Sequence, residues 1–134
     1  MRVLYFCIDN ACRSQLAEAL TNMLGTEGVE AYSAGAAPAA TLDEKACDVM
    51  RELGYEMSGQ YPKSIDDLPE IEFDYAVTLG CGDETPVVKA RMMFDWDIPE
   101  TRGMSVSDIR SVRDTIRDRV ERLLVAPRSV GDKW

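Results

Sequence analysis

Reactive side chains are concentrated between residues 5 and 20, in the stretch YFCIDNACRSQLAEAL. Cys7, Cys12, Arg13 and Ser14 lie there between an apolar run and a helical pattern. A thiol beside an arginine and a helix N-terminus ionises more readily than a free thiol, and the thiolate is the nucleophilic form. The chain has no histidine, so local dipoles would replace the usual base. The stretch therefore predicts a nucleophilic Cys7 with a lowered pKa, whose sulfur Ser14 stabilises by a hydrogen bond.

The same stretch also predicts an anion-binding loop. A short loop between Cys7 and Arg13 directs consecutive backbone N–H groups inward, and the helix that follows adds a partial positive charge. The planar donor fork of Arg13 matches a tetrahedral oxyanion. The residues expected to bind the oxyanion are Ile8, Asp9, Asn10, Ala11, Cys12, Arg13 and Ser14.

These residues must be positioned by alternating strands and helices. Apolar patterns predict strands at 2–7, 29–35, 73–80 and 91–98, helices at 14–24, 41–53 and 105–123, and a short helix at 64–68. Such alternation is typical of an α/β fold with a parallel sheet and helices on both faces, and ligands bind beyond the carboxyl ends of its strands. Cys7, Gly35, Cys81 and residues 95–97 follow strand ends, so we expect them to converge on one edge.

Composition narrows the classes of protein to consider. A length of 134 residues fits one catalytic domain spanning 1–134. The net charge of −9 argues against nucleic acid or an anionic membrane as a partner. No apolar stretch approaches the roughly 20 residues of a membrane helix, and MRVLYFCIDN lacks the features of a secretory signal. We therefore expect a cytoplasmic protein.

The four cysteines are Cys7, Cys12, Cys47 and Cys81. Without an export signal they are expected to be free thiols rather than a disulfide framework. Their spacing and the lack of histidine do not fit a zinc site, so no metal is expected. Cys47 falls on the apolar face of the 41–53 helix and is expected in the core.

Several motifs together resemble a known family. CIDNACRS (7–14) resembles the phosphate-binding loop of low-molecular-weight protein tyrosine phosphatases and of the arsenate reductases that share their fold. Residues 31–68 are similar to the long middle segment of the reductases, and DYAVTLGCGDETP (74–86) to their cysteine-bearing segment. The resemblance implies a three-layer, doubly wound fold with a four-stranded parallel sheet, and a thiol-dependent arsenate reductase active in arsenic detoxification.

The resemblance also implies roles for particular residues. Cys7 would be the nucleophile and Arg13 the oxyanion clamp. Asn10 would hold the strained conformation of the loop, which suits its tolerance of left-handed backbone angles. Ser14 would stabilise the thiolate, and Ser33 would support Asn10 from the neighbouring strand end.

The sequence departs from the phosphatase pattern in its general acid. The phosphatases use an aspartate in an Asp-Pro-Tyr segment, which is absent here. The nearest counterpart is DWDIPETRG, in which Glu100 and Asp97 are the candidates for protonating a leaving oxygen. Both are alternatively surface acids of an acidic protein.

A second departure concerns the thiol relay. Reductases of this kind form a cysteine–arsenate adduct, and another cysteine then expels arsenite. Many relatives have two cysteines in the segment around Cys81, but Thr85 occupies the later position here. Cys81 is the favoured second thiol, because Gly80 and Gly82 would let its segment move. Cys12 or a small thiol from solution are the alternatives.

Three functions remain open from the sequence. Arsenate reduction leads, with no tightly bound cofactor and with thioredoxin, a glutaredoxin or a small thiol as reductant. A tyrosine phosphatase is the second, because phosphate and arsenate share charge and shape; Tyr32, Tyr61 or Trp96 would then line the mouth of the site. The third is a non-catalytic anion-binding or redox-sensing module that uses Cys7 and Cys12 as a switch.

Overall fold

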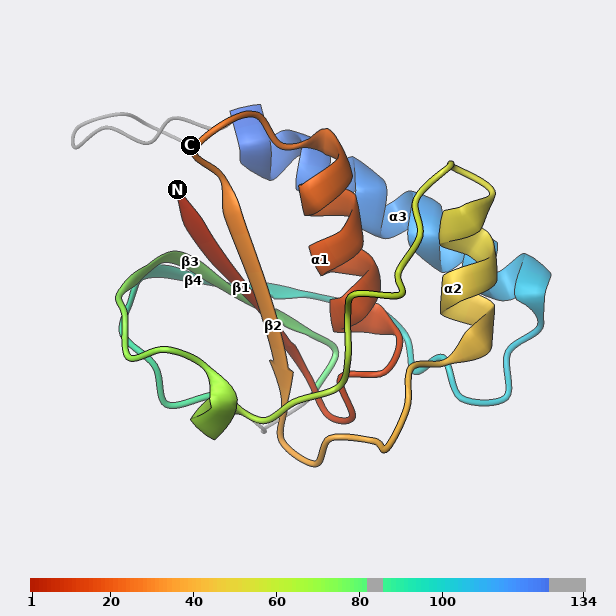
Figure 1. The fold of residues 1–134 in the computed structure, drawn as a ribbon, viewed down its shortest axis with the longest axis horizontal. Helices are drawn as coiled ribbons and strands as arrows, with labels where there is room; N and C mark the ends of the chain where they lie inside the picture. Colours follow the sequence, from red (N-terminus) through yellow and green to blue (C-terminus); the bar gives the residue numbers. More distant parts are fainter. Residues whose placement is uncertain (82–85, 126–134) are drawn as a thin grey trace.

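The computed structural model describes residues 1–81 and 86–125. Within these residues no helix has both the length and the apolar character that crossing a bilayer requires. The secondary-structure elements (Figure 1) are, in chain order, β1 (Arg2–Cys7), α1 (Arg13–Leu24), β2 (Glu30–Gly35), α2 (Glu44–Arg51), the 3-10 helix η1 (Ile65–Asp67), β3 (Phe73–Leu79), β4 (Ala90–Trp96) and α3 (Val106–Val125).

The strands form one four-stranded sheet in the order β2-β1-β3-β4, and every pairing is parallel. Cys7 at the end of β1 pairs with Gly35 at the end of β2, and Leu79 at the end of β3 pairs with Trp96 at the end of β4. The predicted α/β class with a four-stranded parallel sheet is therefore confirmed. All four carboxyl ends lie at the same edge of the sheet, where the sequence places its reactive residues.

The two faces of the sheet are covered unequally. The larger apolar core joins one face to all three α-helices, and includes Tyr5 of β1, Leu16 of α1 and Ile116 of α3. Side chains of the opposite face, such as Leu4 and Phe6, form a smaller core with Cys81, against which residues of η1 and its flanking chain pack. Figure 1 shows η1 across the strands from α1. In the described part of the chain this second covering layer contains a 3-10 turn rather than an α-helix.

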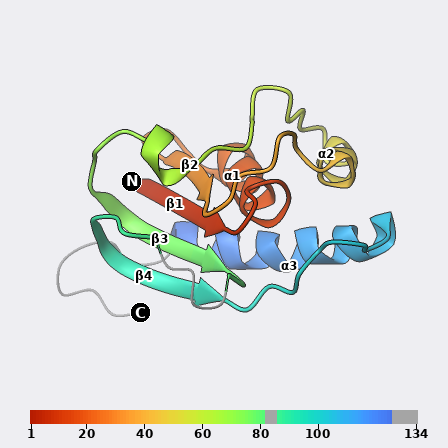
Figure 2. The same ribbon diagram turned by 90° about the horizontal axis from the view of Figure 1, so that it is seen from below.

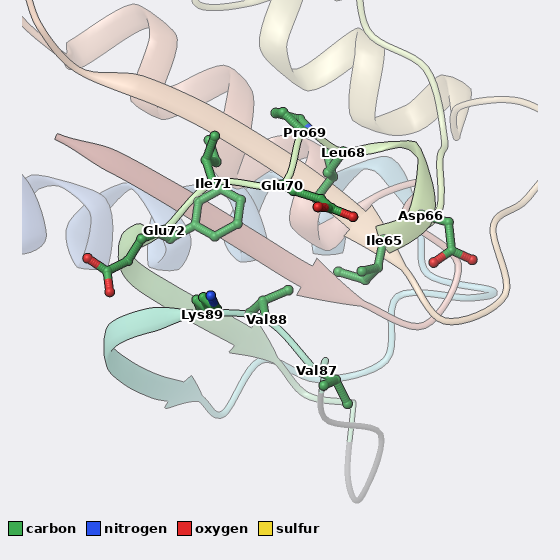
Figure 3. A pocket seen from close by; sticks show the side chains of 11 residues that line it. Ile65, Asp66, Leu68, Pro69, Glu70, Ile71, Glu72, Val87, Val88 and Lys89 are labelled. Atoms are coloured by element: carbon green, nitrogen blue, oxygen red, sulfur yellow. The ribbon is translucent and has the colours of Figure 1, made fainter.

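A cavity of about 750 Å³ lies in this second layer (Figure 3). It lies between the chain around η1 and the segment that leads into β4, with Ile65, Ile71 and Val88 among its apolar lining. Asp66, Glu70 and Glu72 add carboxylates to the lining. None of the residues that the sequence suggests for chemistry lines this cavity.

Helices α2 and α3 begin with side-chain caps, whereas α1 does not. The Asp43 side chain accepts a hydrogen bond from the Lys45 N–H at 2.9 Å, which caps the start of α2. The Ser105 hydroxyl accepts one from the Asp108 N–H at 3.1 Å, which caps α3. Helix α1 has no such side-chain cap: its N-cap residue is Cys12. The first amide groups of α1 are therefore not taken up by a side-chain cap, and Figure 2 shows the loop from β1 leading directly into this end of the helix.

Leu20 of α1 is fully buried in the larger core. We therefore expect that shortening its side chain strongly destabilises the fold. Leu20→Ala should lower the free energy of unfolding by about 2–5 kcal/mol, because it removes buried methyl groups and leaves a cavity. Val125→Ala at the exposed end of α3 should change it by less than about 0.5 kcal/mol. Urea unfolding followed by circular dichroism measures both, and equal effects would contradict this packing.

Candidate active site

The loop between β1 and α1 holds Asn10 in a left-handed conformation. Asn10 has a φ of 52°, the only positive φ of a non-glycine residue in the described chain. Its side chain is completely buried and donates from Nδ2 to Ser14 Oγ at 2.7 Å. The predicted role of Asn10 in holding the loop therefore has a geometric basis: the strained residue is fixed by its own side chain.

Two residues that sequence reasoning missed complete the environment of Asn10. Gln15 Nε2 donates to both the Asn10 carbonyl and Asn10 Oδ1, each at 3.0 Å. The backbone N–H of Lys63 donates to Asn10 Oδ1 at 2.9 Å. Gln15 could have been suspected as a buried polar residue in the first turn of a helix. Lys63 could not, because it contributes a backbone group from a distant segment.

Ser33 does not support Asn10, and that expectation is wrong. Its hydroxyl donates to Glu18 Oε1 at 2.5 Å, one helical turn of α1 beyond Ser14. The Lys63 ammonium lies 3.9 Å from the same carboxylate oxygen. Ser33 therefore joins β2 to α1 behind the loop rather than holding the loop itself.

Cys7 is fully buried, and its Sγ lies 2.8 Å from Ser14 Oγ. Because Ser14 Oγ already accepts a hydrogen bond from Asn10, its own O–H is free to point at the sulfur. Burial raises the pKa of the Cys7 thiol above its ordinary value; the Ser14 hydroxyl, the backbone N–H groups of Ser14 and Asn10 and the Arg13 charge lower it only in part. The prediction of a lowered pKa is therefore wrong, because the sequence does not show how deeply the sulfur is buried.

The loop backbone resembles the predicted anion site with one exception. The N–H groups of Asn10 and Ser14 point at the Cys7 sulfur, as the effect on its pKa shows. The N–H of Ala11 instead donates to Asp9 Oδ1 at 3.1 Å. The Asp9 carboxylate also lies 3.9 Å from Cys7 Sγ. Asp9 thus adds a negative charge at the loop, which Arg13 and the helix N-terminus must outweigh for an oxyanion to bind.

Arg13 is buried where three segments of the chain meet. Its side chain is only 3% exposed. Nη1 donates to the carbonyl oxygens of Gly80 at 3.0 Å and Ile98 at 3.4 Å, and Nη2 lies 3.7 Å from Glu100 Oε2. The guanidinium is thus held in one orientation at the carboxyl edge of the sheet, beside the loop that carries Cys7.

The two candidate acids differ in position. Glu100 accepts hydrogen bonds from the N–H groups of Thr101 at 2.9 Å and Arg102 at 3.2 Å, besides its ion pair with Arg13. Partial burial raises the pKa of Glu100, but these N–H donors and the Arg13 charge outweigh burial and hold it below its ordinary value. Asp97 is exposed, and no contact with the loop is seen for it within the described residues. The structure therefore brings Glu100 to the site as an ionised partner of Arg13, and the role of Asp97 stays a prediction.

The four cysteines are free and occupy different environments. Cys81 is 5% exposed at the carboxyl end of β3. Burial raises its pKa, and the charges of Asp95, Cys7 and Arg13 also act on it, so it lies within electrostatic range of the nucleophile and the clamp.

Cys12 is buried in the larger core, where burial raises its pKa to about 12. Cys47, which the sequence places in the core, is instead only partly buried and packs against that core. Gly82 and Thr85 lie outside the described residues.

The aromatic residues considered for the mouth of the site lie elsewhere, with one exception. Trp96 is buried against Tyr5, and Tyr32 packs edge-on against Phe73. Tyr61 is 61% exposed, and its carbonyl accepts a hydrogen bond from Gln15 at 2.9 Å. Only Tyr61 of the three is linked to the loop.

The fold and the site together define an α/β protein with a cysteine-and-arginine oxyanion loop between its first strand and first helix. The sequence pattern of the low molecular weight phosphotyrosine protein phosphatase family matches residues 2–133. The chain belongs to this family.

Individual relatives agree with that assignment. The chain is 31% identical to the glutaredoxin arsenate reductase of a Synechocystis species, over 92% of this chain and 95% of the relative. A solved arsenate reductase in the phosphate binding state is 31% identical and superposes with a TM-score of 0.83, covering 92% of this chain and 95% of that one. The thioredoxin-dependent arsenate reductase of Corynebacterium glutamicum is also 31% identical, with a TM-score of 0.73, and the match covers 91% of this chain and 59% of that chain.

The hydrogen bond from Ser14 predicts a change in the titration of Cys7. Ser14→Ala should raise the pKa of Cys7 further, because it removes a donor that stabilises the thiolate. Ser33→Ala is the matched control, since it removes a buried hydroxyl that serves Glu18 instead. Thiolate absorbance against pH, in a background with alanine at the other three cysteines, measures the pKa. An unchanged curve for Ser14→Ala would contradict this role.

Proposed function

We propose that the chain reduces arsenate to arsenite through a thiol relay. The observation that carries the proposal is the convergence of Cys7, Arg13 and Cys81 at one edge of the sheet, with the thiols of Cys7 and Cys81 and the guanidinium of Arg13 in electrostatic range of one another. A nucleophile, a cationic clamp and a second thiol are the three groups that such a relay needs. The relatives named above are arsenate reductases.

In the first step, the Cys7 sulfur attacks the arsenic of a hydrogenarsenate dianion bound by the loop and Arg13. The thiol proton passes to the hydroxyl oxygen of the arsenate, the sulfur–arsenic bond forms and that oxygen leaves as water. Because the dianion takes up the proton itself, this step does not need a Cys7 that is already ionised. No separate acid is required, which fits the ionised state of Glu100.

In the second step, the Cys81 sulfur attacks Cys7 Sγ. A disulfide forms, the sulfur–arsenic bond breaks and its electron pair remains on arsenic, which is reduced from the pentavalent to the trivalent state. The Cys81 proton passes to an arsenic-bound oxygen, and arsenite leaves. Cys12 is the weaker candidate for this step, because it is packed in the larger core with a pKa of about 12.

The Cys7–Cys81 disulfide is then reduced by an external thiol. One relative is named a glutaredoxin arsenate reductase and another is described as thioredoxin-dependent, so the proposed reductant is a small thiol–disulfide protein. Two thiols of the reductant protein supply the two electrons that the Cys7–Cys81 disulfide accepts.

Hydrolysis of a phosphate ester is the second candidate function, because the same loop fits phosphate and the family is named for phosphatases. An ester leaving group needs an acid placed beside it. Glu100 is held as a carboxylate by Arg13 and two backbone N–H groups, and this favours arsenate over an ester as the substrate.

The proposal predicts arsenate-dependent oxidation of NADPH in the presence of thioredoxin and thioredoxin reductase. A parallel assay uses glutaredoxin, glutathione and glutathione reductase. Cys7→Ser and Cys81→Ser should each lose essentially all turnover, because each supplies one sulfur of the disulfide. Cys47→Ser is the matched control and should keep the wild-type rate, and mass spectrometry of the arsenate-treated protein should find Cys7 joined to Cys81.

Other outcomes would overturn the proposal in distinct ways. Hydrolysis of p-nitrophenyl phosphate that needs Cys7 but not Cys81, without arsenate turnover, would make the protein a phosphatase. A Cys7–Cys12 bridge alone would remove Cys81 from the relay. Thiol oxidation without turnover of either anion would leave only a redox-sensing module.

A further inference from the structure

The orientation of the Arg13 guanidinium depends on two backbone carbonyls from outside the oxyanion loop. Nη1 carries two hydrogens, and these face the carbonyl oxygens of Gly80 and Ile98. This leaves Nε and Nη2, on the other edge of the guanidinium, for Glu100 and an oxyanion. The Gly80 contact, at 3.0 Å, is the shorter of the two.

Gly80 can make this contact only without a side chain. Its φ is +70°, a conformation that residues with a Cβ rarely adopt. A Cβ built there would overlap the Ile98 carbonyl oxygen and lie 2.8 Å from Arg13 Nη1. Any other residue at position 80 must therefore displace the guanidinium, or move the end of β3 away from the segment after β4.

We propose that Gly80 is a positioning residue for the oxyanion clamp. Its carbonyl fixes Arg13 Nη1, and its missing side chain lets Ile98 approach the same nitrogen. Because Gly80 directly precedes Cys81, one peptide segment sets both the orientation of the clamp and the start of the chain that carries the second thiol. The inference rests on the oxyanion site of the proposed function but not on the reduction of arsenate.

The test is the affinity for inorganic phosphate, measured by titration calorimetry on the reduced protein. Gly80→Ala should bind phosphate at least about tenfold more weakly, the order of effect expected when a charge-assisted hydrogen bond is misplaced. Gly54→Ala is the matched control: Gly54 has a φ of +82°, but a Cβ there meets nothing within 4 Å. Gly54→Ala should be strained in the same way and still bind phosphate with wild-type affinity. Equal phosphate affinities for wild type and Gly80→Ala would overturn the inference.

A double-mutant cycle separates positioning of Arg13 from general damage. In an Arg13→Lys background the forked guanidinium is absent, so Gly80→Ala should cause little further loss of phosphate affinity. Losses that multiply independently would contradict an action through Arg13. If Gly80→Ala does not fold, the wild-type protein decides the question: the Nη1 hydrogens of Arg13 should give a resolved, slowly rotating NMR signal, and rapid averaging would overturn the inference.

The measurement is independent of arsenate turnover. A protein whose phosphate affinity depends on Gly80 but which does not reduce arsenate would contradict the proposed function alone. A protein that reduces arsenate through Cys7 and Cys81, yet binds phosphate equally well with alanine at position 80, would contradict this inference alone.

Discussion

The buried positive charge of Arg13 is the constraint on which the rest of the site depends. A guanidinium with a side chain only 3% exposed must find compensating acceptors, because an uncompensated buried charge is far more costly than a paired one. It finds two carbonyls and one carboxylate. These come from the segments that follow β3 and β4, and Arg13 itself begins α1. The parallel sheet is what brings the three segments together, since it aligns all its carboxyl ends at one edge.

A second network of hydrogen bonds, separate from the partners of Arg13, ends at the nucleophile Cys7. Gln15 and the Lys63 N–H fix the Asn10 side chain, Asn10 fixes the Ser14 hydroxyl, and that hydroxyl meets the Cys7 sulfur. The Asn10 amide fixes the direction of the first bonds, since its Oδ1 accepts and its Nδ2 donates to Ser14 Oγ, and the Ser14 hydroxyl is left able to donate to a Cys7 thiolate. The left-handed backbone of Asn10 is the local cost of this arrangement, and the buried side-chain contacts maintain it.

The sequence was sufficient for the sheet, the loop and the grouping of residues beyond the strand ends, because these follow from local patterns and from the geometry of parallel strands. It was insufficient for pKa values and hydrogen-bond partners that depend on burial or on a backbone group from a distant segment. The pKa of Cys7 depends on how deeply its sulfur is buried, and the Ser33 hydroxyl donates to Glu18 rather than to Asn10. The partners of Arg13 are carbonyl oxygens, which every residue has, so no residue type in the sequence could indicate them.

The absence of histidine now has a different explanation from the one that the sequence suggested. Local dipoles do not by themselves lower the pKa of Cys7, because desolvation outweighs them. In the proposed mechanism a substrate dianion changes this balance, since it brings both the base that takes the thiol proton and the oxygen that leaves as water. A phosphate ester lacks that second property, because its leaving group is an alkoxide or phenolate that needs an external acid. Glu100 is held as a carboxylate beside Arg13 and is therefore not available as that acid. The proposed preference for arsenate over a phosphate ester thus depends on the acid–base groups around the loop rather than on the loop itself.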